Sequence, residues 1–193
     1  GHYDGFMNVR KNRLQWGWDN APRIITSGII RDVYIEDLPP KRFEEMYVYT
    51  NELYDDYAIL GISYIYKTPV KVLTDHRLRV SLLDGDEVIN STVFPARFVQ
   101  GLVKFGVERS KIELWWPSGF GNPKLYDLKI EMLEGEECVA LYTQKYGIRT
   151  IDVIHTDDIN EDGTGEFLFR VNGENVFLRG TGWKPRDPFA SEA

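Results

Sequence analysis

The chain has 193 residues, of which 42% are hydrophobic and 27% charged. This composition is typical of a globular protein, and the length allows one or two domains. The formal net charge of −7 excludes a general excess of Lys and Arg, so we expect no nucleic-acid partner. No run approaches the roughly 18 apolar residues of a membrane-spanning helix, so we expect no membrane partner either.

Residues 1–38 contain a tryptophan-rich segment and two short apolar runs. Trp18 and Asp19 lie in the sequence Gln-Trp-Gly-Trp-Asp, and the apolar residues between Arg23 and Ile35 predict two strands. Leu38-Pro39-Pro40 then interrupts the pattern, because proline removes a backbone donor and fixes φ. We place a domain boundary at this point.

Strand patterns recur about every ten residues between Lys41 and Tyr146. The turns Asp84-Gly85-Asp86 and Glu134-Gly135-Glu136 each predict a hairpin. The predicted strands cover 46–49, 57–66, 77–83, 87–94, 98–105, 111–115, 125–133 and 138–146. Seven or eight short strands over about 105 residues are typical of a two-sheet fold. We therefore predict an all-β, immunoglobulin-like antiparallel β-sandwich with extra β segments at both ends.

The last part of the chain contains the densest pattern. Residues 151–154 predict a strand, and apolar and polar residues alternate on both sides of Asn172-Gly173. This residue pair favours a type I′ turn, so a hairpin is predicted there. Residues 182–187 then bring together a tryptophan, three charges, a glycine and a proline, which is more than a connecting turn requires.

Three segments resemble family 2 glycoside hydrolases, most closely the β-mannosidase-like members. The first is the hairpin ending in Arg179-Gly180 with the Trp-x-Pro-x-Asp segment 183–187, which resembles the start of the catalytic barrel. The second is the Trp-Trp-Pro-x-Gly-x-Gly loop 115–121, and the third is Gly17-Trp18-Asp19. Two positions depart from the family pattern: Asn20 stands where a second tryptophan is usual, and Gly182 where asparagine is usual.

The resemblance implies a fragment with three parts. Residues 1–38 would be the C-terminal end of an N-terminal jelly-roll sandwich domain, 39–147 the immunoglobulin-like sandwich, and 148–193 the truncated start of a (β/α)8 catalytic barrel. It implies that Trp18, Asp19, Trp183 and Asp187 contact the substrate in the parent enzyme, with Arg179 in a supporting position. An aromatic face can stack on a sugar ring while a carboxylate accepts hydrogen bonds from its hydroxyls.

No catalytic residue is predicted within the chain. A retaining glycosidase needs two carboxylates about 5 Å apart, and the resemblance implies that both are glutamates located beyond Ala193. In the family the acid/base follows an asparagine, and Asn51-Glu52 is such an Asn-Glu pair in this chain. This pair lies at the end of a predicted strand of the sandwich, where a solvated edge carboxylate is the simpler interpretation.

The implied function is that of a non-catalytic fragment whose sandwich positions the sugar-binding domain against the barrel of a retaining enzyme. The implied partners are the remainder of the parent chain and, in the full-length enzyme, the carbohydrate substrate. A bacterial polysaccharide-degrading parent would be periplasmic or secreted. The alternative is a free-standing carbohydrate-binding sandwich, which would need Trp18, Trp115 or Trp116 exposed in a row. Paired tryptophans before Pro and Gly more often form a packing corner.

Two further patterns have simpler interpretations than a metal site. Asp158–Gly163 matches the opening of a calcium-binding loop, but Phe169 stands where a bidentate glutamate is needed and the flanks predict strands. The three histidines lie in unrelated segments, so we expect no metal and no cofactor. Trp18 and Asp19 have an alternative interpretation as a buried strand residue and a turn former.

Overall fold

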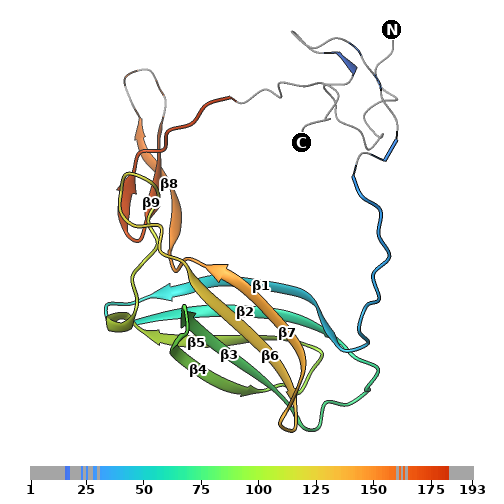
Figure 1. Ribbon diagram of the computed structural model, residues 1–193. Helices are drawn as coiled ribbons and strands as arrows, with labels where there is room; N and C mark the ends of the chain where they lie inside the picture. The colour runs from blue at the N-terminus through green and yellow to red at the C-terminus, as the bar shows by residue number, and fades with distance from the viewer. Residues whose placement is uncertain are drawn as a thin grey trace. The chain divides into compact units, whose positions relative to one another are not determined.

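The computed structural model describes residues 16–17, 23, 25, 28–29, 31–159, 161, 163 and 165–182. Leu38–Leu178 form one compact unit, and Gly1–Asp37 with Arg179–Ala193 form a second. The first unit contains a two-sheet sandwich followed by a small separate sheet (Figure 1). In the described part of the chain, no helix is long and apolar enough to cross a membrane. The all-β prediction is confirmed for this unit.

The sandwich consists of a three-stranded and a four-stranded antiparallel sheet. The orders are β1-β2-β5 and β4-β3-β6-β7, so β1 and β7 are both edge strands. The strands are β1 (Arg42–Leu53), β2 (Tyr57–Lys67), β3 (His76–Asp84), β4 (Glu87–Pro95), β5 (Gln100–Glu108), β6 (Tyr126–Glu134) and β7 (Glu137–Tyr146).

Alternation of apolar residues builds the core between the two sheets. In β2, the side chains of Leu60, Ile62 and Tyr66 are almost completely buried, because every second residue points inward. The core continues with Leu78, Val80 and Leu82 of β3, Phe105 and Val107 of β5, and Leu128, Ile130 and Met132 of β6. Burial of each large apolar side chain contributes about 1.5–3 kcal/mol, so this core holds the two sheets together.

Both predicted sandwich hairpins are confirmed. β3 pairs with β4 across Gly85 and β6 pairs with β7 across Gly135, and the φ angles of the two glycines are 61° and 59°. This left-handed conformation favours glycine, which has no Cβ to clash. In the second turn, Arg77 of β3 donates a hydrogen bond of 2.6 Å to the carbonyl oxygen of Gly135.

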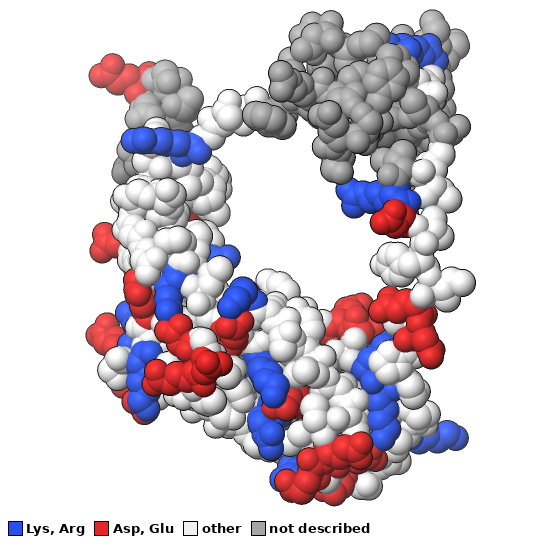
Figure 2. Space-filling model, viewed as in Figure 1, with Lys and Arg blue, Asp and Glu red and all other residues white. Residues whose placement is uncertain are grey.

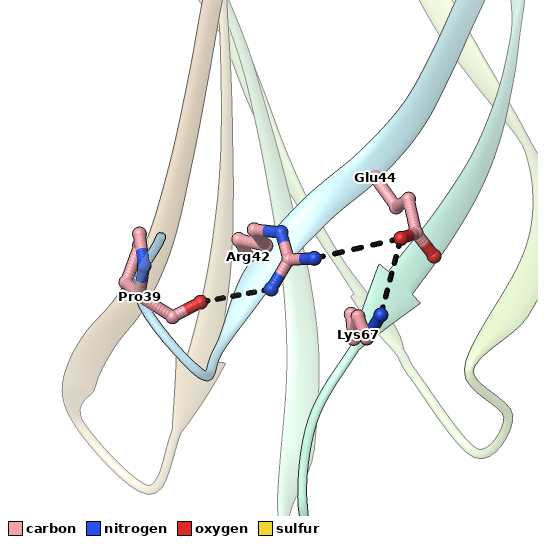
Figure 3. Close-up of polar contacts among 4 residues, drawn as sticks. All are labelled: Pro39, Arg42, Glu44 and Lys67. Carbon is pink, nitrogen blue, oxygen red and sulfur yellow. Dashed lines mark hydrogen bonds and ion pairs between the residues drawn. The ribbon is translucent and has the colours of Figure 1, made fainter. Parts of the chain in front are cut away.

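The beginning of β1 is anchored by polar contacts that also involve the preceding proline. The guanidinium of Arg42 donates to the carbonyl oxygen of Pro39 at 3.1 Å, and another of its nitrogens lies 3.5 Å from Glu44 Oε1 (Figure 3). Lys67 Nζ, at the end of β2, lies 3.4 Å from the same carboxylate oxygen. The segment around the predicted boundary therefore leads directly into an anchored edge strand.

Charges of both signs are interleaved over the sandwich. Figure 2 shows Lys and Arg side chains next to Asp and Glu side chains on the face that it presents, without a continuous basic patch. Three ion pairs illustrate the pattern: Lys104–Glu52, Lys124–Asp84 and Lys145–Asp127. Such alternation produces no strong field of one sign over this face.

Two predicted strand segments differ in the structure. The strand expected at 111–115 is wrong: a 3₁₀ helix at Arg109–Lys111 is followed by an irregular segment up to Leu125. The reason is that Trp115 N–H donates to the carbonyl of Ile148 at 2.9 Å instead of joining a sheet ladder. Of the two strands expected between 23 and 35, residues 31–35 are irregular and exposed, and much of the rest lies outside the described residues.

The hairpin around Asn172-Gly173 is confirmed and belongs to a second, three-stranded sheet. Its order is β10-β9-β8, with β8 at Ile151–Ile159, β9 at Gly165–Val171 and β10 at Glu174–Val176. Asn172 has φ 52° and Gly173 φ 86°, and positive φ at both central residues is what a type I′ turn requires.

Candidate functional site

Four of the five predicted site residues lie outside the described residues. These are Trp18, Asp19, Trp183 and Asp187, and their proximity to a sugar stays a prediction. Arg179 is described, and it is exposed in the irregular segment that follows β10. The structure therefore does not test whether the five residues come together.

Among the described residues, the candidate functional site is the connection between the sandwich and the β8–β10 sheet. We call it the junction, and it consists of Thr50, Trp115, Arg149, Thr150 and Asn172. Asn172 lies at its centre because its turn projects both backbone and side-chain groups toward the sandwich. Its N–H donates to the Thr150 carbonyl at 3.1 Å, and its Oδ1 accepts from Thr150 N–H at 3.0 Å. Its Nδ2 donates to the Trp115 carbonyl at 3.0 Å.

Trp115 and Arg149 form the second part of the junction. The Arg149 guanidinium carbon lies 4.6 Å from the centroid of the Trp115 ring, and Nη1 donates to the Gly147 carbonyl at 2.8 Å. Stacking of a cation on tryptophan contributes about 0.5–1 kcal/mol at exposed sites. A Cβ on Gly147 would lie 2.7 Å from Cδ1 of Trp115, so the ring occupies the space that this glycine leaves free.

Thr50 connects the junction to the edge strand β1. Its hydroxyl lies 2.9 Å from the hydroxyl of Tyr146, and it accepts a hydrogen bond of 3.2 Å from Arg149 N–H. Burial is the main cause that raises the pKa of Tyr146 above its ordinary value. The phenol therefore stays protonated at neutral pH and keeps both hydrogen-bonding functions in this contact.

Trp115 and Trp116 form a packing corner and do not make an exposed aromatic row. Both side chains are half-buried. Trp116 N–H donates to the Asn122 carbonyl at 3.0 Å, and a Cβ on Gly121 would lie 2.8 Å from Cγ of Trp116. Because both tryptophans pack closely against the chain, this arrangement does not favour the alternative of a free-standing carbohydrate-binding sandwich.

The carboxylate of Glu52 has the wrong environment for a glycosidase acid. Asn51 Nδ2 donates to it at 2.6 Å, Lys104 Nζ lies at 3.3 Å, and the Tyr54 hydroxyl donates as well. The Tyr54 hydrogen bond, followed by the Lys104 contact, holds the pKa of Glu52 below its usual value. A general acid needs the opposite shift, so Glu52 is a solvated edge carboxylate, as the sequence suggested.

The described residues contain no group of three or more His, Cys, Asp or Glu side chains placed to hold a metal. Part of the turn Asp158–Gly163 lies outside them, so calcium binding there is not tested. Its flanks are the strands β8 and β9, whereas a calcium-binding EF-hand loop lies between helices.

Sequence reasoning did not predict the junction as a site. Asn172 was identified from its turn signal alone, and no role was predicted for Thr50 or Arg149. The signal that could have suggested it is the pairing of Trp115 with a glycine and a cation at 147 and 149. Thr50 has no local signal, because its contacts come from residues about 100 positions away.

The architecture is that of a two-sheet β-sandwich connected to a further small sheet. The family model described as glycosyl hydrolases family 2 matches residues 42–149, which is more than half of the chain, and the chain belongs to this family.

Within the family, the chain is similar to β-mannosidases. It is 32% identical over 181 residues to β-mannosidase B of Aspergillus terreus, covering 94% of this chain and 20% of the relative. It is 28% identical over 201 residues to β-mannosidase B of Aspergillus clavatus, covering 95% of this chain and 21% of the relative. The chain thus spans about a fifth of the length of these relatives.

Solved structures show the same fold. The β-D-mannosidase of Dictyoglomus thermophilum superimposes with a TM-score of 0.73 at 24% identity, over 93% of this chain and 22% of that one. The β-glucuronidase of Ruminococcus gnavus gives a TM-score of 0.52 at 23% identity, over 74% of this chain and 20% of that one. The chain is therefore a β-mannosidase-like fragment of family 2 with a β-sandwich fold.

Proposed function

We propose that the sandwich is a non-catalytic spacer that positions a sugar-binding domain against the catalytic barrel of a β-mannosidase-like glycoside hydrolase. The similarity to named β-mannosidases supports the enzyme class. Retention of configuration and the two glutamates beyond Ala193 remain part of the proposal. So do the domain limits 1–38, 39–147 and 148–193.

The observation that carries this proposal is the uncovered apolar face of the β8–β10 sheet. Ile151, Val153, Phe167 and Phe169 share this face with the buried Val171 and Val176, because Ile151 pairs with Val171, and Phe169 pairs with both Val153 and Val176. The side chains of Ile151, Val153 and Phe167 are 53%, 51% and 55% exposed. A small sheet with one apolar face is not stable in isolation and must cover that face.

The same sheet carries an apolar hollow of about 480 Å³. It is lined by Phe167, Leu168, Phe169, Asn175, Val176, Phe177 and Leu178. The rings of Phe167 and Phe169 meet edge to face, with centroids 5.0 Å apart, a favourable aromatic geometry. We assign the cover to the remainder of the parent polypeptide, since the relatives are about five times as long as this chain.

A charge substitution on the apolar face tests this docking. Phe167→Asp should hardly change the melting temperature of the 193-residue chain, because Phe167 is about half exposed there. It should lower the melting temperature of the parent enzyme, since the carboxylate would be buried without a partner. Leu102→Asp is the matched control, because Leu102 is 56% exposed on β5. If the parent tolerates both substitutions equally, the face is open to solvent in the enzyme and the docking proposal is wrong.

For the sugar site we retain Trp18, Asp19, Trp183 and Asp187 as substrate contacts and Arg179 as their support. Asp19→Ala in the parent enzyme should lower kcat/KM. The corresponding loss of transition-state stabilisation should be about 1.5–3 kcal/mol, the contribution of one hydrogen bond to a charged group. Unchanged kinetics would identify Asp19 as a turn former.

The 193-residue chain alone should hydrolyse no glycoside. The test is an assay of the purified chain with aryl β-mannoside, β-galactoside and β-glucuronide substrates, with the parent enzyme as positive control. Activity that disappears on Glu52→Gln would show that the Asn51-Glu52 pair is catalytic after all.

A further inference from the structure

A groove of about 520 Å³ runs along the edge of the sandwich beside β1. One wall is the consecutive segment 47–51 of β1, and the other is Tyr146 with the segment 149–152. Both β1 and β7 are edge strands, so the groove lies where the two sheets are open. Its volume falls within the range of about 300–1,000 Å³ that is common for small-ligand sites.

Two tyrosines form the aromatic part of the groove. The rings of Tyr47 and Tyr49 are stacked, with centroids 5.5 Å apart and planes inclined by 27°. Tyr47 is 66% exposed. The end of the Tyr49 ring lies over Gly61 of β2, where a Cβ would be only 2.4 Å from Cζ. Gly61 therefore leaves the space in which this ring is held, and the aromatic surface is preformed.

The opposite wall is polar and contains one charge of each sign. Arg149 is fixed there by Trp115 and by its hydrogen bond to the Gly147 carbonyl. Asp152 is exposed, and its partner in the β8–β9 register is Arg170, with no ion pair between the two in the described part of the chain. A cation and a carboxylate together give the groove no net charge, so neither a polyanion nor a polycation is the ligand that it fits.

We propose that this groove binds a neutral oligosaccharide of pyranose units. The apolar face of a sugar ring can lie on the exposed tyrosine, because an aromatic ring offers a flat apolar surface with a polar tip. Asp152 can accept hydrogen bonds from sugar hydroxyls and Arg149 can donate to them, and such charge-assisted bonds are stronger than neutral ones. An open groove also suits a chain of sugars better than an enclosed pocket does.

The lining of this groove includes none of the residues proposed as substrate contacts, and it shares Ile151 with the apolar face of the β8–β10 sheet. The groove would give the protein a second binding site for a long glycan, in addition to a catalytic site. The idea does not depend on the docking of a barrel. Its failure would leave the outcome of the Phe167→Asp experiment unaffected.

The test is an NMR titration of the ¹⁵N-labelled 193-residue chain with β-1,4-mannohexaose and, in parallel, with cellohexaose. We expect saturable shifts of the amide signals of 47–51 and 149–152 with at least one of the two sugars. Tyr47→Ala and Asp152→Asn should each weaken binding about tenfold, the equivalent of 1.4 kcal/mol. Tyr57→Ala is the matched control, because Tyr57 is 46% exposed on β2 and does not line the groove.

Three results would overturn the proposal. The first is a spectrum that neither sugar changes, as expected if the groove instead receives an extended peptide along the β1 edge. The second is a set of shifts confined to residues away from the groove. The third is an affinity that Tyr47→Ala and Asp152→Asn leave equal to that of Tyr57→Ala. The spectra of the free variants also show directly whether each has kept the fold.

Discussion

Asn172→Ala is the substitution that tests the junction most directly. It removes the hydrogen bond accepted from Thr150 N–H and the one donated to the Trp115 carbonyl, both of 3.0 Å. Each contributes about 0.5–1.5 kcal/mol net. Alanine at φ 52° adds about 1–2 kcal/mol, because its Cβ is strained in the left-handed conformation. We therefore expect the free energy of opening of the β8–β10 sheet to fall by about 2–5 kcal/mol.

Two matched variants separate these contributions. Asn172→Gly keeps the turn conformation and loses only the hydrogen bonds, so it should cost about 1–3 kcal/mol. Asn172→Asp keeps the acceptor for Thr150 N–H but turns a carboxylate oxygen toward the Trp115 carbonyl. The assay is native-state amide hydrogen exchange in β8, β9 and β10, with circular dichroism to follow the sandwich. If the free energy of opening measured by exchange for Asn172→Ala stays within about 0.5 kcal/mol of that of the unchanged chain, these bonds do not hold the sheet.

Two further predictions concern the sandwich. Gly147→Ala should lower the free energy of unfolding in urea by about 1–3 kcal/mol, because the new Cβ overlaps the Trp115 ring. Gly106→Ala is the control and should be neutral, because a Cβ at this position would have nothing within 4 Å. Stability should also fall as the pH drops below about 4.3, the unperturbed value of a glutamate, because the hydrogen bond from Lys41 is the largest cause that lowers the pKa of Glu134. A depressed folded-state pKa gives a contribution that is present above the unfolded-state pKa and lost as the pH falls through the folded-state pKa. Glu134→Gln should reduce this acid sensitivity, and an unchanged pH profile would contradict the assignment.

Local signals predicted the parts of the fold that local physics determines. The turns at Gly85, Gly135 and Asn172-Gly173 need a left-handed backbone, and only a few residue types adopt it easily. Alternation predicted the buried side of the strands, because one face of each sheet covers the core. The strand predicted at 111–115 was wrong because it rested on a short alternation alone. In the structure, the backbone N–H of Trp115 donates to the carbonyl of Ile148 instead.

The junction could not be predicted in this way, because its contacts join residues that are distant in the sequence. Asn172 and Trp115 are separated by 57 positions, and Arg149 and Thr50 by 99. No periodicity or spacing relates such pairs. The predicted sugar contacts Trp18, Asp19, Trp183 and Asp187 rest on the resemblance and lie outside the described residues.

The sandwich and the β8–β10 sheet differ in how much of their apolar surface is buried. The sandwich has a continuous apolar core that both of its sheets cover. The β8–β10 sheet has Val171 and Val176 as its buried apolar residues in the described part, and neither belongs to that core. Its links to the sandwich within the described residues are the hydrogen bonds of Asn172 and Thr150, which orient the sheet and contribute about 0.5–1.5 kcal/mol each. A sheet that is oriented by the sandwich but not buried by it has the properties of a docking element, and its half-exposed Phe167 face is where we expect the stabilising contacts with the rest of the enzyme to form.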